Sequence, residues 1–118
     1  MSKLFAIMFL LFIASCASSP KYVPTDSSHL GPSVTSETDC VALGGEWRLH
    51  GISVSEVCVV PTPDGGKACR DTADCRGTCQ APLGTKAGQR VVGACATIFR
   101  PACSQRVSHG VAQARICE

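Results

Sequence analysis

Cysteines are the most prominent residues in this sequence that could do chemistry. The chain contains nine of them among 118 residues, a proportion typical of short secreted domains held together by disulfides. No two of the eight that follow residue 38 are separated by two residues, so the spacings of a zinc ribbon and of a thioredoxin-type redox motif are both absent. We therefore expect eight half-cystines and neither a metal nor another cofactor. These eight are Cys40, Cys58, Cys69, Cys75, Cys79, Cys95, Cys103 and Cys117.

Serine, histidine and aspartate also occur after residue 38, but in no pattern typical of a catalytic site. The serines lie in no nucleophile-elbow sequence, and the sequence identifies no orienting partner for His50 or His109. Asp64, Asp71 and Asp74 could offer carboxylates to calcium, but their spacing does not match an EF-hand. We therefore predict no catalytic residue. A small envelope hydrolase or a metal-dependent enzyme stays open as the alternative.

The ninth cysteine, Cys16, stands at the end of an export signal. Lys3 precedes an uncharged apolar run at residues 4–14, which is shorter than the roughly 20 residues that a membrane span needs. The segment Ile13-Ala14-Ser15-Cys16 resembles the lipobox of bacterial lipoproteins. This resemblance implies that the signal peptide is cut after Ser15 and that Cys16 carries acyl chains. An even number of cysteines is then left to pair.

These features predict three segments and a location. Residues 1–15 are the signal peptide, 16–38 a lipidated flexible tether, and 39–118 a cysteine-rich, disulfide-stapled domain. The tether is rich in Ser, Thr and Pro and has little apolar surface to bury. The lipobox resemblance implies a protein of the bacterial cell envelope that contacts the membrane through its lipid anchor. By resemblance to Gram-negative lipoproteins, Ala17 after the lipidated position favours the outer membrane if the host is Gram-negative.

The elements of the domain are expected to be short. We predict a small disulfide-rich fold of β-hairpins and loops, because large apolar residues are few and turn residues are frequent. Residues 46–49 and 56–60 predict one hairpin, with Trp47 and the valines on its inner face. Residues 103–107 and 112–117 predict a second one around His109-Gly110, where a three-residue loop would place Cys103 opposite Cys117.

Charge and motifs limit the function further. The formal net charge is +2 and the arginines are scattered, which argues against nucleic acid as a partner. The segments Gly44-Gly45-Glu46-Trp47, 64–69 and 74–79 resemble small cysteine-rich envelope proteins of bacteria. This resemblance implies a shared scaffold and transfers no active site to this chain. We expect a non-enzymatic interaction or structural module, for example an inhibitor of a protease or lysozyme. Its partner would be an envelope or extracellular protein.

The loop at residues 61–70 is the predicted binding surface. It is polar, with two prolines and two adjacent glycines, so it has little to bury and should be exposed. Asp64, Lys67 and Arg70 are its charged residues and the predicted binding residues. Because Cys58 and Cys69 bracket the loop, disulfides at both ends would reduce the conformational entropy that it loses on binding.

Overall fold

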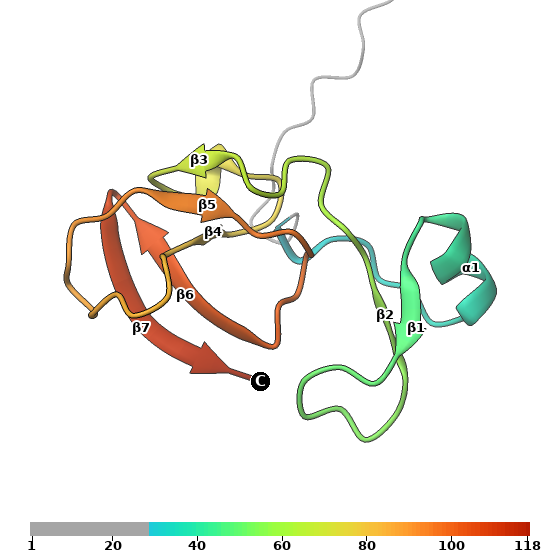
Figure 1. Ribbon diagram of the computed structural model, residues 1–118. Coiled ribbons are helices and arrows are strands. Elements are labelled where there is room, and N and C mark those ends of the chain that lie inside the picture. Colours follow the sequence, from blue (N-terminus) through green and yellow to red (C-terminus); the bar gives the residue numbers. More distant parts are fainter. Residues whose placement is uncertain (1–28) are drawn as a thin grey trace, which may run out of the picture.

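The computed structural model describes residues 29–118, so the predicted signal peptide and Cys16 lie outside the described residues. A helix and a two-stranded hairpin form one unit, and a five-stranded antiparallel sheet forms the other (Figure 1). The coarse prediction of a small disulfide-rich fold of strands and loops is confirmed. No helix within residues 29–118 has the length and apolar character needed to cross a bilayer.

Helix α1 (Glu37–Ala42) is short and well capped. The Ser36 side chain accepts a hydrogen bond from the backbone N–H of Asp39 at 3.2 Å, which satisfies a donor that the first helical turn leaves free. The helix ends where Gly44 adopts a φ of +74°, a conformation that glycine reaches without steric cost. Cys40 is fully buried and forms a disulfide with Cys58.

The first predicted hairpin is confirmed, with shorter strands. β1 (Glu46–Arg48) pairs antiparallel with β2 (Val57–Val59), and Trp47 lies opposite Cys58. The prediction that Trp47 and the valines share the inner face of this hairpin is wrong, however. Side chains alternate along a strand, so Trp47 and Cys58 point to one face while the two valines of β2 point to the other.

Part of the predicted tether contacts the sheet unit. The Nδ1 atom of His29 lies 2.9 Å from the carbonyl oxygen of Gly77, and the guanidinium Nε of Arg100 donates to the carbonyl of Leu30 at 2.9 Å. Helix α1 also crosses the expected boundary at residue 39. The folded part of the chain therefore begins ahead of that residue.

The sheet unit is antiparallel throughout, in the spatial order β3-β5-β4-β6-β7. The strands are short except at one end, where two longer ones form a hairpin (Figure 1). A short 3₁₀ helix, η2 (Thr72–Asp74), lies in the connection between β3 and β4. The strands are β3 (Ala68–Cys69), β4 (Cys79–Gln80), β5 (Gly93–Cys95), β6 (Cys103–Ser108) and β7 (Val111–Cys117).

The β6–β7 hairpin turns more tightly than expected. Ser108 pairs with Val111, so the turn consists of His109 and Gly110 alone, with φ values of 50° and 76°. Positive φ at both central positions is typical of a type I′ turn, whose twist matches that of the flanking strands. The hairpin is confirmed, and the predicted three-residue loop is wrong.

Cys103 nevertheless lies opposite Cys117, as predicted. A two-residue turn by itself would place Cys103 opposite Ile116. The register shifts by one residue at an irregularity between Gln105 and Val107, as a β-bulge does when it adds a residue to one strand. This shift brings the two cysteines into register, and they form a disulfide.

The core is built mainly from cysteines. The disulfides Cys69–Cys79 and Cys75–Cys95 are buried together with Val107. With Cys40–Cys58 and Cys103–Cys117, they pair all eight predicted half-cystines. Large apolar side chains contribute less, because many described ones stay exposed. These are Leu30, Val41, Leu43, Leu49, Ile52, Val54, Leu83, Val92 and Ile116.

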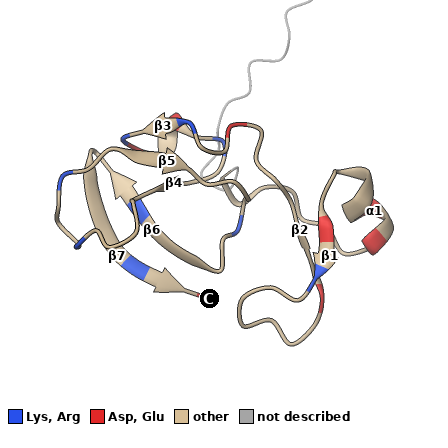
Figure 2. Cartoon of the chain, in the orientation of Figure 1, with Lys and Arg blue, Asp and Glu red and all other residues tan. Residues whose placement is uncertain are grey.

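The two units differ in charge. Acidic residues dominate α1 and β1, whereas Lys and Arg dominate the sheet unit (Figure 2). Residues 75–117, which span β4 to β7, contain six Lys or Arg and no Asp or Glu. The sheet unit therefore presents a surface of mainly positive charge.

Candidate functional site

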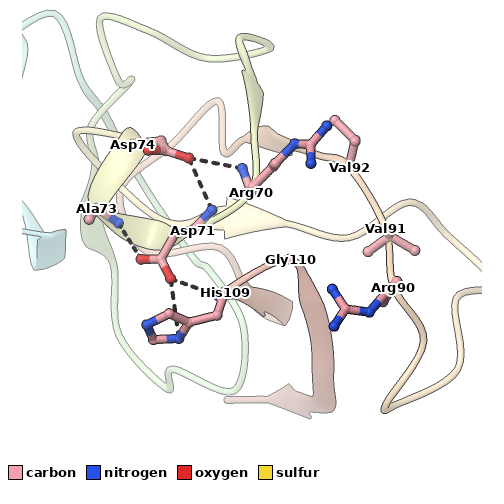
Figure 3. A pocket seen from close by; sticks show the side chains of 9 residues that line it. All are labelled: Arg70, Asp71, Ala73, Asp74, Arg90, Val91, Val92, His109 and Gly110. Carbon is pink, nitrogen blue, oxygen red and sulfur yellow. Dashed lines mark hydrogen bonds and ion pairs between the residues drawn. The ribbon is translucent and has the colours of Figure 1, made fainter.

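The candidate site is an open depression of about 660 Å³ beside the β6–β7 turn. We call it the arginine depression. Segments distant in sequence meet there: the end of β3 with η2, the stretch before β5, and the β6–β7 turn (Figure 3). Its lining comprises Arg70, Asp71, Ala73, Asp74, Arg90, Val91, Val92, His109 and Gly110.

Asp71 connects two walls of the depression. Its carboxylate accepts the backbone N–H of Ala73 at 2.9 Å and that of His109 at 2.8 Å. The His109 ring lies 3.7 Å away. These hydrogen bonds, with that from Ala73 the strongest influence, hold the pKa of Asp71 below its ordinary value of 3.8, because they favour the ionised carboxylate.

Asp74 is turned toward the backbone in the same way. One of its oxygens accepts the N–H of Arg70 at 2.9 Å and that of Asp71 at 3.1 Å. With both carboxylates engaged, the guanidinium groups of Arg70 and Arg90 have no hydrogen-bond or ion-pair partner within residues 29–118. Both side chains lie along the depression (Figure 3). Two arginines are thus available to an incoming anion.

The predicted binding residues have separate positions. Arg70 lines the depression. The Nζ atom of Lys67 donates to the backbone carbonyl of Asp74 at 3.3 Å, at the edge of this region. Asp64 instead holds the chain internally, since its Oδ2 accepts the N–H of Arg76 at 2.8 Å and its Oδ1 is buried.

The loop at residues 61–70 is held more firmly than its composition indicates. Its two bracketing cysteines are both disulfide-bonded, as expected. In addition, Thr62 donates its N–H to Thr97 at 3.0 Å, and Gly66 donates to Cys95 at 2.8 Å. The loop therefore ends in strand β3 and presents Arg70 from a rigid frame.

A serine, a histidine and an aspartate meet beside the depression. The Oγ of Ser108 lies 3.1 Å from Nδ1 of His109, and a carboxylate oxygen of Asp71 lies 3.7 Å from the same nitrogen. In a hydrolase triad, the serine and the carboxylate contact different ring nitrogens so that a proton can pass between them. The His109 side chain is also 93% exposed. These residues do not form a proton relay, although Asp71 is the partner of His109 that the sequence did not identify.

The sulfur atoms do not provide a metal site in their present state. The carboxylate of Asp64 and the sulfurs of Cys75 and Cys95 lie within 4.8 Å of one another. However, both sulfurs belong to one disulfide, and metal coordination by cysteine requires the thiolate.

Arg90 and His109 were missed as site residues because neither belongs to the predicted loop. They are brought to it by backbone pairing: Val91 donates its N–H to Gly110 at 3.0 Å, and Gly110 donates to Arg70 at 2.7 Å. No local signal in the sequence marks this pairing. Comparison of the chain with protein families, with curated proteins and with solved structures gave no match.

Proposed function

We propose that this chain is a lipid-anchored protein of the bacterial cell envelope whose disulfide-rich domain binds an acidic group of a protein partner without catalysis. The observation that carries the proposal is the pair Arg70 and Arg90. Their guanidinium groups line one open depression and have no acidic partner among residues 29–118.

The chemistry of arginine supports an acidic ligand. A guanidinium offers donors in a planar fork that matches a carboxylate, and such charge-assisted hydrogen bonds are stronger than neutral ones. The neighbouring Asp71 and Asp74 do not form an ion pair with these arginines; instead, backbone N–H groups donate to both oxygens of Asp71 and to one oxygen of Asp74. The valine wall of the depression adds apolar contact area.

The rigidity of the site supports recognition. Arg70 follows Cys69, which is bonded to Cys79, and the segment of Arg90 is held by hydrogen bonds to the β6–β7 hairpin. A site that is ordered before binding loses little conformational entropy when it binds.

The lipid anchor is supported by the lipobox resemblance at Cys16 and by the cysteine count. Of nine cysteines, eight form the four disulfides of the described residues. Cys16 is thus the one that no described disulfide uses.

The binding test uses the full chain, purified in a mild detergent, and a fluorescein-labelled hexaglutamate peptide as carboxylate probe. Fluorescence anisotropy would give the Kd of the parent and of the double variant Arg70→Gln/Arg90→Gln. We expect the double variant to bind about tenfold more weakly or worse, since hydrogen bonds to charged groups contribute about 1.5–3 kcal/mol each.

The matched control is Arg106→Gln/Arg115→Gln, which removes the same charge from exposed positions on β6 and β7. We expect this control to change the Kd by less than about twofold, in line with the weak effect of screened surface charges. An equal loss of affinity for hexaglutamate in both double variants would refute recognition at the arginine depression. Absence of binding by the parent would refute it as well.

A further inference from the structure

The loop between β4 and β5 holds a large apolar side chain in solvent. Leu83 is 87% exposed. It lies in a tight turn in which Thr85 donates its N–H to Pro82 at 3.2 Å and its hydroxyl to the same carbonyl at 2.7 Å. Gly84 provides the positive φ of 83° that such a turn requires. Leu83 therefore lies at the exposed tip of a hydrogen-bonded turn.

Leu83 borders an uncharged groove of about 730 Å³ on the sheet unit. Its walls include Pro82, Val92, Ile98 and Pro101, and Val92 is itself 51% exposed. An exposed leucine alone is ordinary, but one that continues an exposed apolar groove marks a contact surface.

The loop at residues 81–92, which borders this groove, carries basic residues and no acidic ones. Residues 75–117 contain no Asp or Glu, and Lys86 and Arg90 lie on the same loop as Leu83. The loop therefore combines two exposed apolar side chains, Leu83 and Val92, with two basic residues.

We propose that the β4–β5 loop, residues 81–92, docks on an anionic lipid surface. Leu83 and Val92 would enter the boundary between headgroups and acyl chains, while Lys86 and Arg90 would lie at the headgroup phosphates. A bilayer with anionic lipids offers apolar and negative groups together over a continuous surface, whereas the hexaglutamate probe offers charge alone. Each basic side chain near such a surface strengthens binding by about fivefold.

This contact is separate from the lipid on Cys16. It shares Arg90 and Val92 with the arginine depression, but its other two residues lie outside that site. Leu83 and Lys86 do not line that depression. Changes at these two residues therefore test the loop while leaving Arg70 and Arg90 in place.

The experiment places a tryptophan at the tip of the loop. In a Trp47→Phe background, Leu83→Trp carries the one indole of the chain. The full chain is reconstituted into vesicles of phosphatidylglycerol with brominated acyl chains, which quench a tryptophan that enters the bilayer. The matched control is Val54→Trp, at a fully exposed position between β1 and β2. Intact mass before and after reduction confirms four disulfides in each variant.

We expect quenching of Leu83→Trp to be at least threefold stronger than that of Val54→Trp. The difference in quenching between the two variants should fall severalfold in vesicles of brominated phosphatidylcholine. It should also fall severalfold when Lys86→Gln is added to Leu83→Trp. Equal quenching at the two positions in phosphatidylglycerol would overturn the docking. Equal quenching of Leu83→Trp in both lipids would overturn the role of charge. An unquenched Leu83→Trp in a chain that still binds hexaglutamate would overturn this inference and leave the proposed function intact.

Discussion

Asp71 fixes His109, which lies 38 residues further along the chain, by accepting its backbone N–H at 2.8 Å. The other carboxylate oxygen accepts the N–H of Ala73 at 2.9 Å. One side chain thus ties η2 to the β6–β7 turn. Since both segments line the arginine depression, the ionised state of Asp71 maintains the shape of the site.

This role gives the stability of the domain an acid dependence. Because the pKa of Asp71 in the folded chain lies below its ordinary value of 3.8, the unfolded chain binds more protons in that interval. The stabilisation is present above pH 3.8 and is lost as the pH falls through the lower folded pKa. We expect the urea midpoint of the parent to fall more steeply below about pH 4 than that of Asp71→Asn.

Asp39→Asn is the control for this titration, because it removes an exposed carboxylate from α1 instead. In this control, the urea midpoint should fall below about pH 4 as steeply as it does in the parent. If the urea midpoint of Asp71→Asn falls as steeply as that of the parent, this carboxylate does not couple folding to pH.

Gln105 is a buried polar side chain whose partners would be left unpaired by an apolar substitution. Its Nε2 donates to the carbonyls of Thr85 at 2.9 Å and Gln113 at 3.0 Å. We expect Gln105→Leu to lower the free energy of unfolding by about 1–3 kcal/mol. The exposed Gln113→Leu should change it by about 0.5 kcal/mol or less. Urea denaturation of both variants checks this, and similar values for the two would contradict it.

The disulfides should differ in their contribution to stability. Cys75–Cys95 and Cys103–Cys117 span 20 and 14 residues, so loop closure predicts a similar effect of about 3 kcal/mol for each. Only the first pair is buried, at 5% and 2% exposure. Replacing it with two alanines should cost about 1–2 kcal/mol more, since a cavity remains. Equal unfolding free energies of the two double-alanine variants would argue against this difference.

Lipidation of Cys16 can be tested by metabolic labelling. Cells that express the full gene should incorporate labelled palmitate into the parent and not into Cys16→Ser, because the thiol is the acceptor in a lipobox. Ser18→Ala, a similar change two residues away, should keep the label. Label retained by Cys16→Ser would mean that the lipobox interpretation is wrong.

Only part of the candidate site could be predicted from the sequence. The polar loop pointed to Arg70, because a segment with little to bury stays at the surface. The composition of the loop could not show that Arg70 lines the site while Asp64 does not. Asp64 instead accepts the backbone N–H of Arg76. Arg90 joins Arg70 through backbone hydrogen bonds that link Val91 to Gly110 and Gly110 to Arg70, and such long-range contacts leave no local pattern.

Features that depend on near neighbours follow from the sequence alone. The cysteine content required a disulfide scaffold, and His109-Gly110 required a turn, because glycine and its neighbour set the local backbone. Tertiary structure decided the rest. Eight cysteines allow 105 pairings, and a register shift between Gln105 and Val107 was needed to place Cys103 opposite Cys117. Likewise, the fold decides which backbone N–H groups donate to each carboxylate. These contacts form only when distant segments pack together, and they decide which charged side chains stay available to a ligand.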